Sequence, residues 1–436
     1  MSVAYGNFVS RRVYECRRYL EKTQWLKKRD LEAFRLKRLK ALVKHAYDNV
    51  PYYHEVFKKA GVGPDDLKSL SDLGRFPVLK KSAIRRNLEC MVAGLVPQKE
   101  FVCRHTTGTT AAPMKLYRER KDVSWGIGAE LRGYGWAGYE VGDKLGLIWN
   151  YPPKRFGSFW FSLERLMGRY RVLHVRELSE SSMSLFADKM RRFRPDFIKG
   201  HAGSTNIFAT FLAKNGVNEI RPRGVLTSCE TLFPYYRKEI EGAFGCRVYN
   251  YYASAEMSHI AAECGHHEAL HVVDENVNLE VVDEDGQVED GEEGRVLLTN
   301  LNDYAMPFIR YEIGDSGRIL DDECQCGRRL RLFTIRGRTN EHFVCGDGSF
   351  TLLCDLQRVF EDLPIQDFQV VQENHDEIVI RIAPQSGYTE KHTDFILKHL
   401  LLVGKAKMKV ELVERILPGK TGKVSHVVSK IATDYT

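Results

Sequence analysis

Residues 105–113 read His105-Thr106-Thr107-Gly108-Thr109-Thr110-Ala111-Ala112-Pro113. Four threonines surround one glycine. The stretch follows residues 101–103, which begin with apolar side chains, and precedes a segment at 114–117 that we expect to be extended. Gly108 has no Cβ, so backbone N–H groups and threonine hydroxyls can approach a polyphosphate closely. The stretch therefore predicts a phosphate-binding loop. The alternative is a threonine-rich hairpin turn without a ligand, because short motifs of this kind also occur by chance.

The composition is that of a folded globular protein. The chain has 436 residues, of which 43% are hydrophobic and 28% charged. That length allows a large core and about two or three domains. The 65 basic residues exceed the 58 acidic ones, which gives a formal charge of +7 without a long single-sign block. This balance favours anionic small molecules such as nucleotides, and we expect no nucleic-acid partner.

The sequence predicts a cytoplasmic protein without a membrane span. Tyr5, Asn7 and Phe8 are followed by Arg11 and Arg12, so the apolar segment of a secretory signal is missing. Uncharged apolar runs of roughly 18 residues do not occur in the sequence. Ten unevenly spaced cysteines then indicate reduced thiols and a candidate metal site, rather than a disulfide framework.

Apolar periodicity predicts an α/β fold. Residues 31–47 repeat apolar side chains at helical spacing until Asn49-Val50-Pro51, which predicts an amphipathic surface helix. Further along, short apolar strands alternate with helical segments, an order typical of an α/β sheet; the strands are expected at 145–149, 197–199, 225–228 and 247–250. Residues 279–282 and 294–299 predict an antiparallel hairpin, and with it a β-rich portion.

The sequence changes character after Gly337-Arg338. It predicts a small α+β domain with strands at 367–372 and 377–382, a helix around 388–403 and a strand at 407–413. Thr339-Asn340-Glu341 form a polar connector. We therefore expect a large N-terminal domain of α/β layers with a β-rich subdomain over residues 1–338, and a small, mobile α+β domain over residues 339–436.

Four further segments follow the threonine-rich stretch. They are Tyr252-Ala253-Ser254-Ala255-Glu256, Pro307-Phe308-Ile309-Arg310-Tyr311-Glu312-Ile313-Gly314-Asp315, Gly337-Arg338 and Leu417-Pro418-Gly419-Lys420-Thr421-Gly422-Lys423. In this order and at these separations they resemble the adenylate-forming superfamily. Together with residues 46–53 and 76–81, they resemble its phenylacetate–CoA ligase branch, which includes CapK-like relatives from capsule and surface-polysaccharide gene clusters.

The resemblance implies an ATP-dependent, AMP-forming acid ligase. A carboxylate would attack the α-phosphate of ATP to give an acyl-adenylate and pyrophosphate, and the acyl group would pass to coenzyme A. One alternative acceptor is an amine or hydroxyl, for example on an amino-sugar. Another alternative is a catalytically degenerate nucleotide-binding protein. A homodimer is common in the branch, although the sequence itself carries no signal for one.

The resemblance also assigns a nucleotide site. Its residues are Thr106, Thr107, Gly108, Thr109, Thr110, Ser228, Glu230, Tyr251, Tyr252, Glu256, Asp315, Arg338 and Lys423. The threonine-rich loop would hold the β- and γ-phosphates, with Thr109 acting catalytically. Tyr252 offers a flat face for adenine, and Glu256 an oxygen ligand for magnesium.

Two charged residues complete this assignment. Asp315 would accept hydrogen bonds from the ribose hydroxyls, because a carboxylate is an acceptor only. Lys423 would meet the α-phosphate and the substrate carboxylate when the small domain closes by rotation near Asn340 and Glu341. Each assignment has a structural alternative, since turn, surface and core uses of these residue types are common.

Cys264, His271, Cys324 and Cys326 supply three sulfurs and one imidazole, enough for a closed structural zinc site. Free buried cysteines are the alternative. His266 and His267 compete for the fourth ligand position, and we prefer His271 because its Leu270-His271 context matches the family. The expected role is to stabilise the β-rich portion.

The sequence departs from the family pattern near the predicted phosphate site, where no lysine directly follows Pro113. Ala255 stands where the family usually has threonine or serine before the glutamate, and Ala111 stands where glycine is usual. Loss of one charge-assisted hydrogen bond would cost about 1.5–3 kcal/mol, enough to slow the reaction without abolishing it.

Overall fold

The computed structural model describes residues 5–97, 100–105, 114–149, 169–284, 286–338, 342–344, 350–352, 359–360, 363–374, 377–400, 407–419 and 423–430. The chain divides into two compact units. The first contains Met1–Asp143 and Tyr249–Ile335, and the second contains Gly168–Val248 and Arg336–Thr436 together with the strand Leu145–Trp149. The domain boundary expected at residue 338 stays a prediction.

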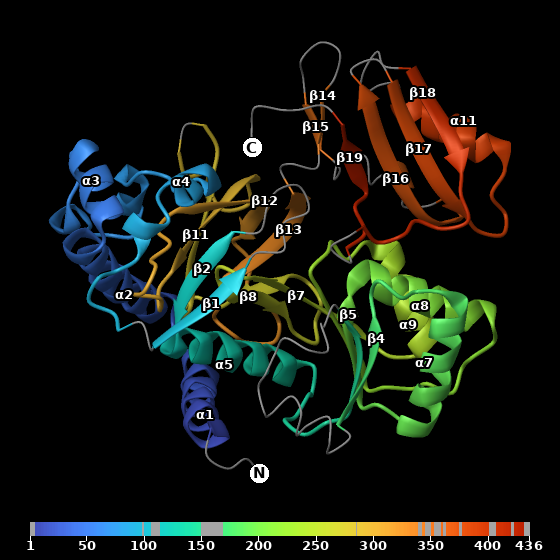
Figure 1. Ribbon diagram of the computed structural model, residues 1–436, viewed down its shortest axis with the longest axis horizontal. Coiled ribbons are helices and arrows are strands. Elements are labelled where there is room, and N and C mark those ends of the chain that lie inside the picture. The colour runs from blue at the N-terminus through green and yellow to red at the C-terminus, as the bar shows by residue number, and fades with distance from the viewer. Residues whose placement is uncertain are drawn as a thin grey trace. The chain divides into compact units, whose positions relative to one another are not determined.

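The first unit begins with helices (Figure 1). They are α1 (Tyr5–Thr23), α2 (Lys28–Asn49), α3 (Pro51–Lys59), α4 (Lys81–Arg86) and α5 (Arg120–Trp136), with short 3₁₀ turns at Pro64–Asp66, Ser71–Arg75 and Glu89–Met91. α2 confirms the expected helix. It ends at Asn49 because Pro51 lacks an N–H and starts the next helix at its first position, where that N–H would be unpaired in any case.

Strands β1 (Phe101–His105) and β2 (Lys115–Glu119) form an antiparallel pair in the first unit. The threonine-rich loop joins these two strands in sequence. Thr106, Thr107, Gly108, Thr109 and Thr110 lie outside the described residues. The extended segment expected after the loop is thus confirmed by β2, and phosphate binding stays a prediction.

The first unit also has a large sheet. Its strands lie in the order β10 (Val277–Val282), β11 (Gly294–Asn300), β12 (Tyr311–Leu320), β13 (Leu332–Arg338), β9 (Leu270–Val272), β8 (Ser258–Glu263) and β7 (Val248–Ser254). β10 and β11 pair antiparallel, which confirms the expected hairpin. Apolar side chains of this sheet share a core with α2 and α3, including Leu42, Phe57, Leu279 and Phe333.

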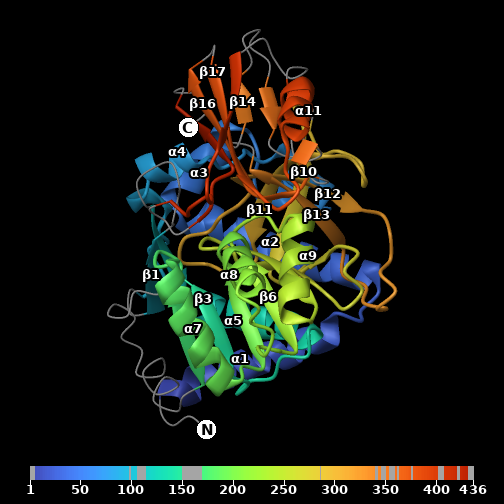
Figure 2. The same cartoon turned by 90° about the vertical axis from the view of Figure 1, so that its right-hand side faces the viewer.

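The second unit has a parallel sheet in the order β6 (Gly224–Ser228), β5 (Phe197–His201), β3 (Leu145–Trp149) and β4 (Tyr170–His174). Helices α7 (Glu180–Phe193), α8 (Ala202–Lys214) and α9 (Pro234–Phe244) follow these strands. Figure 2 shows the three helices side by side over β3 and β6. Alternation of strands and helices produces the α/β fold that the sequence predicts.

The C-terminal part of the second unit is α+β, as expected. Its sheet has the order β18 (Lys407–Leu412), β17 (Glu377–Pro384), β16 (Ile365–Asn374) and β19 (Val427–Ser429), with α11 at Glu390–Leu400 and a small pair of strands, β14 (His342–Val344) and β15 (Phe350–Leu352). Apolar residues of this part, such as Phe368 and Val424, belong to the same core cluster as Phe233 of the parallel-sheet part.

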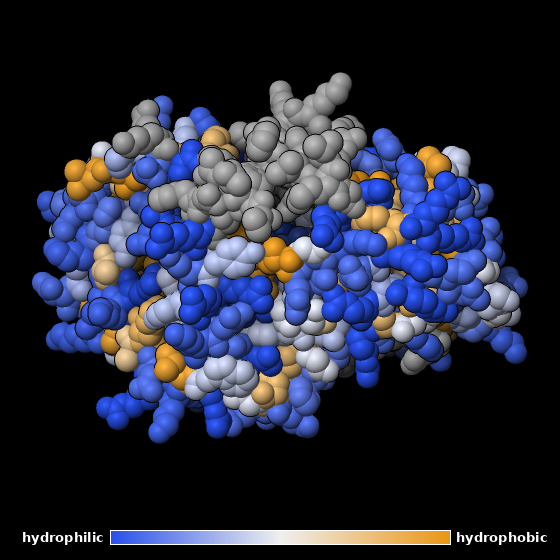
Figure 3. Space-filling model, turned by 90° about the horizontal axis from the view of Figure 1, so that it is seen from below, coloured by the Kyte–Doolittle hydropathy of each residue, from blue (hydrophilic) through white to orange (hydrophobic). Residues whose placement is uncertain are grey.

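Within the described residues, no helix is long and apolar enough to cross a membrane. The face drawn in Figure 3 is mainly hydrophilic outside the grey atoms, and its apolar residues are scattered. This distribution agrees with the 28% of charged residues in the sequence.

Candidate active site

Tyr252 and Asp315 lie together in the first unit. Tyr252 is on β7 and Asp315 is on β12, and both side chains are buried. The Tyr252 hydroxyl donates a hydrogen bond to Asp315 Oδ2 at 2.5 Å, and the Tyr252 ring stacks on Phe333 with 6.1 Å between centroids. The structure therefore joins the residue expected to contact adenine with the residue expected to bind the ribose.

Glu256 follows β7 in the turn that leads to β8. Its side chain is buried, and its Oε1 accepts a hydrogen bond from the Tyr311 hydroxyl at 3.0 Å. A carboxylate fixed through one oxygen keeps its other oxygen as an acceptor or metal ligand. Tyr311 was not predicted as a site residue, although it stands in the quoted segment four residues before Asp315.

Tyr251 and Arg338, two further predicted site residues, differ from Tyr252, Glu256 and Asp315 in their surroundings. Tyr251 neighbours Tyr252 on β7, but its ring packs against Tyr134 at 5.2 Å and stacks on His259 at 5.5 Å. It is thus part of an aromatic cluster in the first unit. Arg338 is the last residue of β13 and is exposed.

Glu230 holds the segment that follows Lys423, and all of these residues belong to the second unit. Ser228 ends β6, Cys229 has a φ of 73°, and Glu230 comes next. Glu230 Oε2 accepts from the amide of Gly203 at 2.7 Å, and Oε1 accepts from the amide of Val424 at 2.6 Å. The carboxylate that was expected to bind the nucleotide thus bridges the start of α8 and the residue after Lys423.

The surroundings of Glu230 are closely packed. Burial raises its pKa to about 7, while the two backbone amides and nearby Lys423 oppose this shift. A Cβ at Gly203 would lie 2.9 Å from Val424 Cγ2 and 3.0 Å from Glu230 Oε2. Gly203 is therefore needed for the segment to approach the start of α8 this closely.

A second polar cluster holds the segment after Lys423 at His426. The Tyr236 hydroxyl donates to Asp367 Oδ2 at 2.9 Å, and His426 Nε2 lies 3.0 Å from Asp367 Oδ1. All three side chains are buried. These residues were not predicted, because the sequence shows no spacing that would bring positions 236, 367 and 426 together.

The four expected metal ligands come together in the first unit. Cys264 follows β8, His271 lies on β9, and Cys324 and Cys326 follow β12. Their ligand atoms all lie within 4.8 Å of one another, with 3.6 Å between the sulfurs of Cys264 and Cys324. Ligands about 2.3 Å from a tetrahedral zinc ion would be separated by about 3.8 Å.

The histidines near this cluster differ in their partners. His271 Nε2 lies 3.4 Å from the Cys326 sulfur, and burial lowers the pKa of His271 to about 4. The imidazole is therefore neutral, as a metal ligand must be. His267 instead lies 3.2 Å from Glu263 Oε2. The geometry of the cluster thus favours His271 over His267.

Comparison with known proteins finds relatives among the phenylacetate-coenzyme A ligases and a protein CapK. The chain is 28% identical over 323 residues to the phenylacetate-coenzyme A ligase of Pseudomonas putida, covering 72% of each chain. It is 29% identical over 333 residues to that of Escherichia coli (strain K12), again covering 72% of each. The protein CapK of Staphylococcus aureus is 22% identical over 367 residues, covering 81% of this chain and 78% of CapK.

A family model and a solved structure extend these matches. Residues 343–430 match the CapK C-terminal domain. The crystal structure of a 2-hydroxyisobutyryl-CoA ligase in the postadenylation state has a TM-score of 0.77 at 21% identity, covering 93% of this chain and 91% of that one. The chain is therefore a homologue of the phenylacetate–coenzyme A ligases and of CapK, with the fold of an adenylate-forming coenzyme A ligase.

Proposed function

We propose that this protein is an ATP-dependent, AMP-forming ligase for a carboxylic acid. The acid oxygen attacks the α-phosphorus of ATP, and the bond to the β-phosphate breaks to release pyrophosphate. A thiol, which we assign to coenzyme A, then attacks the acyl carbon. AMP leaves with the electron pair of the C–O bond, and the thiol proton passes to solvent.

The observation that carries this proposal is the contact between Glu230 and the amide of Val424. It holds the segment that carries Lys423 near the carboxyl end of β6, and the carboxyl ends of parallel strands are where such sheets bind ligands. We assign Lys423 to the charge on the α-phosphate and the acid during the first step.

The first unit supplies the other polar groups that the reaction needs. We assign Asp315 to the ribose hydroxyls and Glu256 to a magnesium ion, because both are buried carboxylates held by tyrosine hydroxyls. The threonine-rich loop is assigned to the outer phosphates, with Thr109 as a donor to the leaving pyrophosphate. Magnesium would neutralise the charge of those phosphates.

We further propose that Cys264, His271, Cys324 and Cys326 hold one structural zinc ion. Four ligands close the tetrahedral coordination sphere, which leaves no position for a substrate. The ion would join β8, β9 and the segment after β12, which are far apart in sequence. Its contribution is to stability rather than to the chemical steps.

A pyrophosphate-release screen over a library of carboxylic acids tests the ligase proposal, with products identified by mass spectrometry. We expect release that depends on one class of acid, and an acyl-adenylate when coenzyme A is omitted. Lys423→Ala should slow release by about 10²–10³-fold, as loss of a positioned charge in an active site does. Lys409→Ala, which removes a half-exposed lysine on β18, should not change it. Absence of acid-dependent release, or of ATP binding, would contradict the proposal.

A second candidate acceptor follows from the resemblance to CapK-like relatives from polysaccharide gene clusters, with which the match of residues 343–430 to the CapK C-terminal domain is compatible. In this alternative the acyl-adenylate reacts with an amine or hydroxyl, for example on an amino-sugar. The same screen distinguishes the two, because a thioester forms with coenzyme A in one case and an amide or ester with the sugar in the other.

A further inference from the structure

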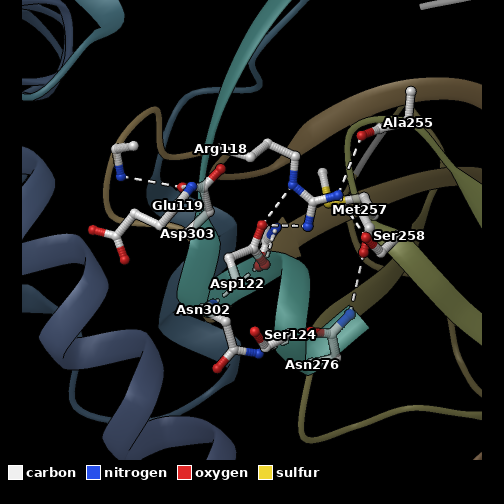
Figure 4. A network of polar contacts seen from close by, with 12 residues as sticks. Arg118, Glu119, Asp122, Ser124, Ala255, Met257, Ser258, Asn276, Asn302 and Asp303 are labelled. Atoms are coloured by element: carbon white, nitrogen blue, oxygen red, sulfur yellow. Dashed lines mark hydrogen bonds and ion pairs between the residues drawn. The ribbon is translucent and has the colours of Figure 1, made fainter. Parts of the chain in front are cut away.

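A buried arginine on a different strand, Arg118, contacts the turn that carries Glu256. Arg118 has no role in the proposed ligase reaction. Arg118 lies on β2, the strand that leaves the threonine-rich loop, and its side chain is buried. Figure 4 shows its guanidinium between Asp122 and the turn from Ala255 to Ser258. One strand therefore connects two segments that we assign to the phosphates and the metal.

The Arg118 guanidinium contacts two groups: the carboxylate of Asp122, and the turn from Ala255 to Ser258. Its Nε donates to Asp122 Oδ2 at 2.5 Å, and Nη2 forms an ion pair with the same oxygen. Its Nη1 donates to Ser258 Oγ at 2.5 Å and to the carbonyl oxygen of Ala255 at 3.3 Å. The planar guanidinium thus spans the residues on both sides of Glu256 while Asp122 fixes its orientation.

The turn itself depends on such support. Ser258 has a φ of 59°, a conformation that an L-residue adopts only when its surroundings impose it. The approach of α5 to the turn is also close, because a Cβ at Gly126 would lie 2.4 Å from Ser258 Oγ. Asn276 holds the other side of the turn by donating to the Met257 carbonyl at 3.1 Å (Figure 4).

We propose that Arg118 is a positioning residue for the magnesium–nucleotide complex, acting through the turn that carries Glu256. Ala255 has no hydroxyl, and Arg118 contacts the turn through the Ala255 backbone carbonyl and the Ser258 hydroxyl. This inference rests on the proposed function, because it takes Glu256 as a magnesium ligand. A displaced turn would move the carboxylate away from the ion and weaken binding of the magnesium form of ATP.

The test measures the magnesium concentration that gives half-maximal ATP binding and, in parallel, half-maximal acid-dependent pyrophosphate release. Ser258→Ala keeps the Arg118–Asp122 pair and removes one bond to the turn. We expect its half-saturating magnesium concentration to rise about fivefold. Arg118→Lys keeps a positive charge but cannot span both acceptors, and we expect a rise of roughly tenfold.

Lys121→Met is the matched control, because it removes an exposed cation three residues from Arg118. Its half-saturating magnesium concentration should equal that of the wild type. A merely structural role for Arg118 would lower the active fraction and leave the magnesium dependence unchanged. If Arg118→Lys does not fold, Ser258→Ala decides the question alone.

Two outcomes separate this inference from the ligase proposal. If the wild type binds ATP with magnesium while the folded variants show an unchanged magnesium dependence, the role of Arg118 is overturned and the ligase proposal stands. If the wild type binds no ATP, both are overturned. Magnesium-dependent ATP binding that weakens in both variants supports the inference even where no acid substrate has been found.

Discussion

The two units hold their proposed site residues in different ways. In the first unit, hydrogen bonds to side chains of β12 fix Tyr252 on β7 and Glu256 in the turn after it, and one of these bonds fixes Asp315. In the second, Lys423 is placed by the chain around it, through the amide of Val424 on Glu230 and the cluster at His426. The first arrangement links site geometry to the stability of the sheet. The second places the lysine that we propose as catalytic through its neighbours in the chain, and we expect that its position can be disturbed without unfolding the unit.

Buried ion pairs also link site geometry to stability in the first unit. The first unit contains Arg132 with Glu275, whose side chains are 1% and 0% exposed, and Asp274 between Arg35 and Arg331. Such pairs add little net stability when both partners are present, but removing one partner leaves an uncompensated buried charge. Substitutions in this unit should therefore affect folding first.

The largest expected effect is that of Arg132→Met. Glu275 would keep only the Thr23 hydroxyl among its present side-chain partners, and its charge would stay buried. We expect the free energy of unfolding to fall by about 3–5 kcal/mol in denaturant titration. The double variant Arg132→Met/Glu275→Leu should recover most of this loss, since it removes both charges. A single-variant loss below about 1 kcal/mol would show that the sheet tolerates the charge.

Metal removal tests the same unit with a smaller expected effect. The wild type should contain about one zinc ion per chain by elemental analysis, and Cys324→Ala should lose it. The melting temperature should fall by several degrees, at about 2–4 °C for each kcal/mol lost from a domain of 150–250 residues. Cys90→Ser changes an exposed cysteine and should alter neither quantity. Protein that stays zinc-free after purification with zinc present would contradict the assignment.

The sequence predicted elements better than the contacts between them. The helix at Lys28–Asn49 and the hairpin of β10 and β11 follow from local periodicity and turn residues, and both are present. Three cysteines could be chosen because their residue type limits the chemistry, whereas His271 was preferred to the other two histidines for its resemblance to the family. In contrast, the contacts of Arg118 with Ser258 and of Glu230 with Val424 join residues 140 and 194 positions apart. No local pattern encodes such pairs, and the assignment of Glu230 to the nucleotide stays a prediction.

Glu230→Gln gives the smallest expected change in stability. It tests whether the bond between Glu230 and Val424 positions Lys423 in the second unit. Glutamine offers one acceptor oxygen to two amides, so either Gly203 or Val424 faces an NH₂ group. Above about pH 7, where the wild-type carboxyl is charged, loss of a bond to this acceptor is worth about 1.5–3 kcal/mol, which corresponds to roughly ten- to hundredfold slower pyrophosphate release. Binding of ATP should change less, because the nucleotide contacts assigned to Asp315 and Glu256 lie in the first unit.

The pH dependence of stability distinguishes a role of Glu230 in holding the Lys423 segment from a general loss of folding. Burial raises the pKa of Glu230 to about 7, above its ordinary value of about 4.3. The stability that the protonated carboxyl contributes is thus complete below the ordinary pKa and is lost as pH rises through about 7. Glu230→Gln cannot titrate. Its free energy of unfolding relative to the wild type should therefore increase between about pH 4.5 and 7.5, while its activity stays low. A variant that recovers activity as its relative stability rises would show that Glu230 contributes to folding alone, and that Lys423 is placed by other contacts.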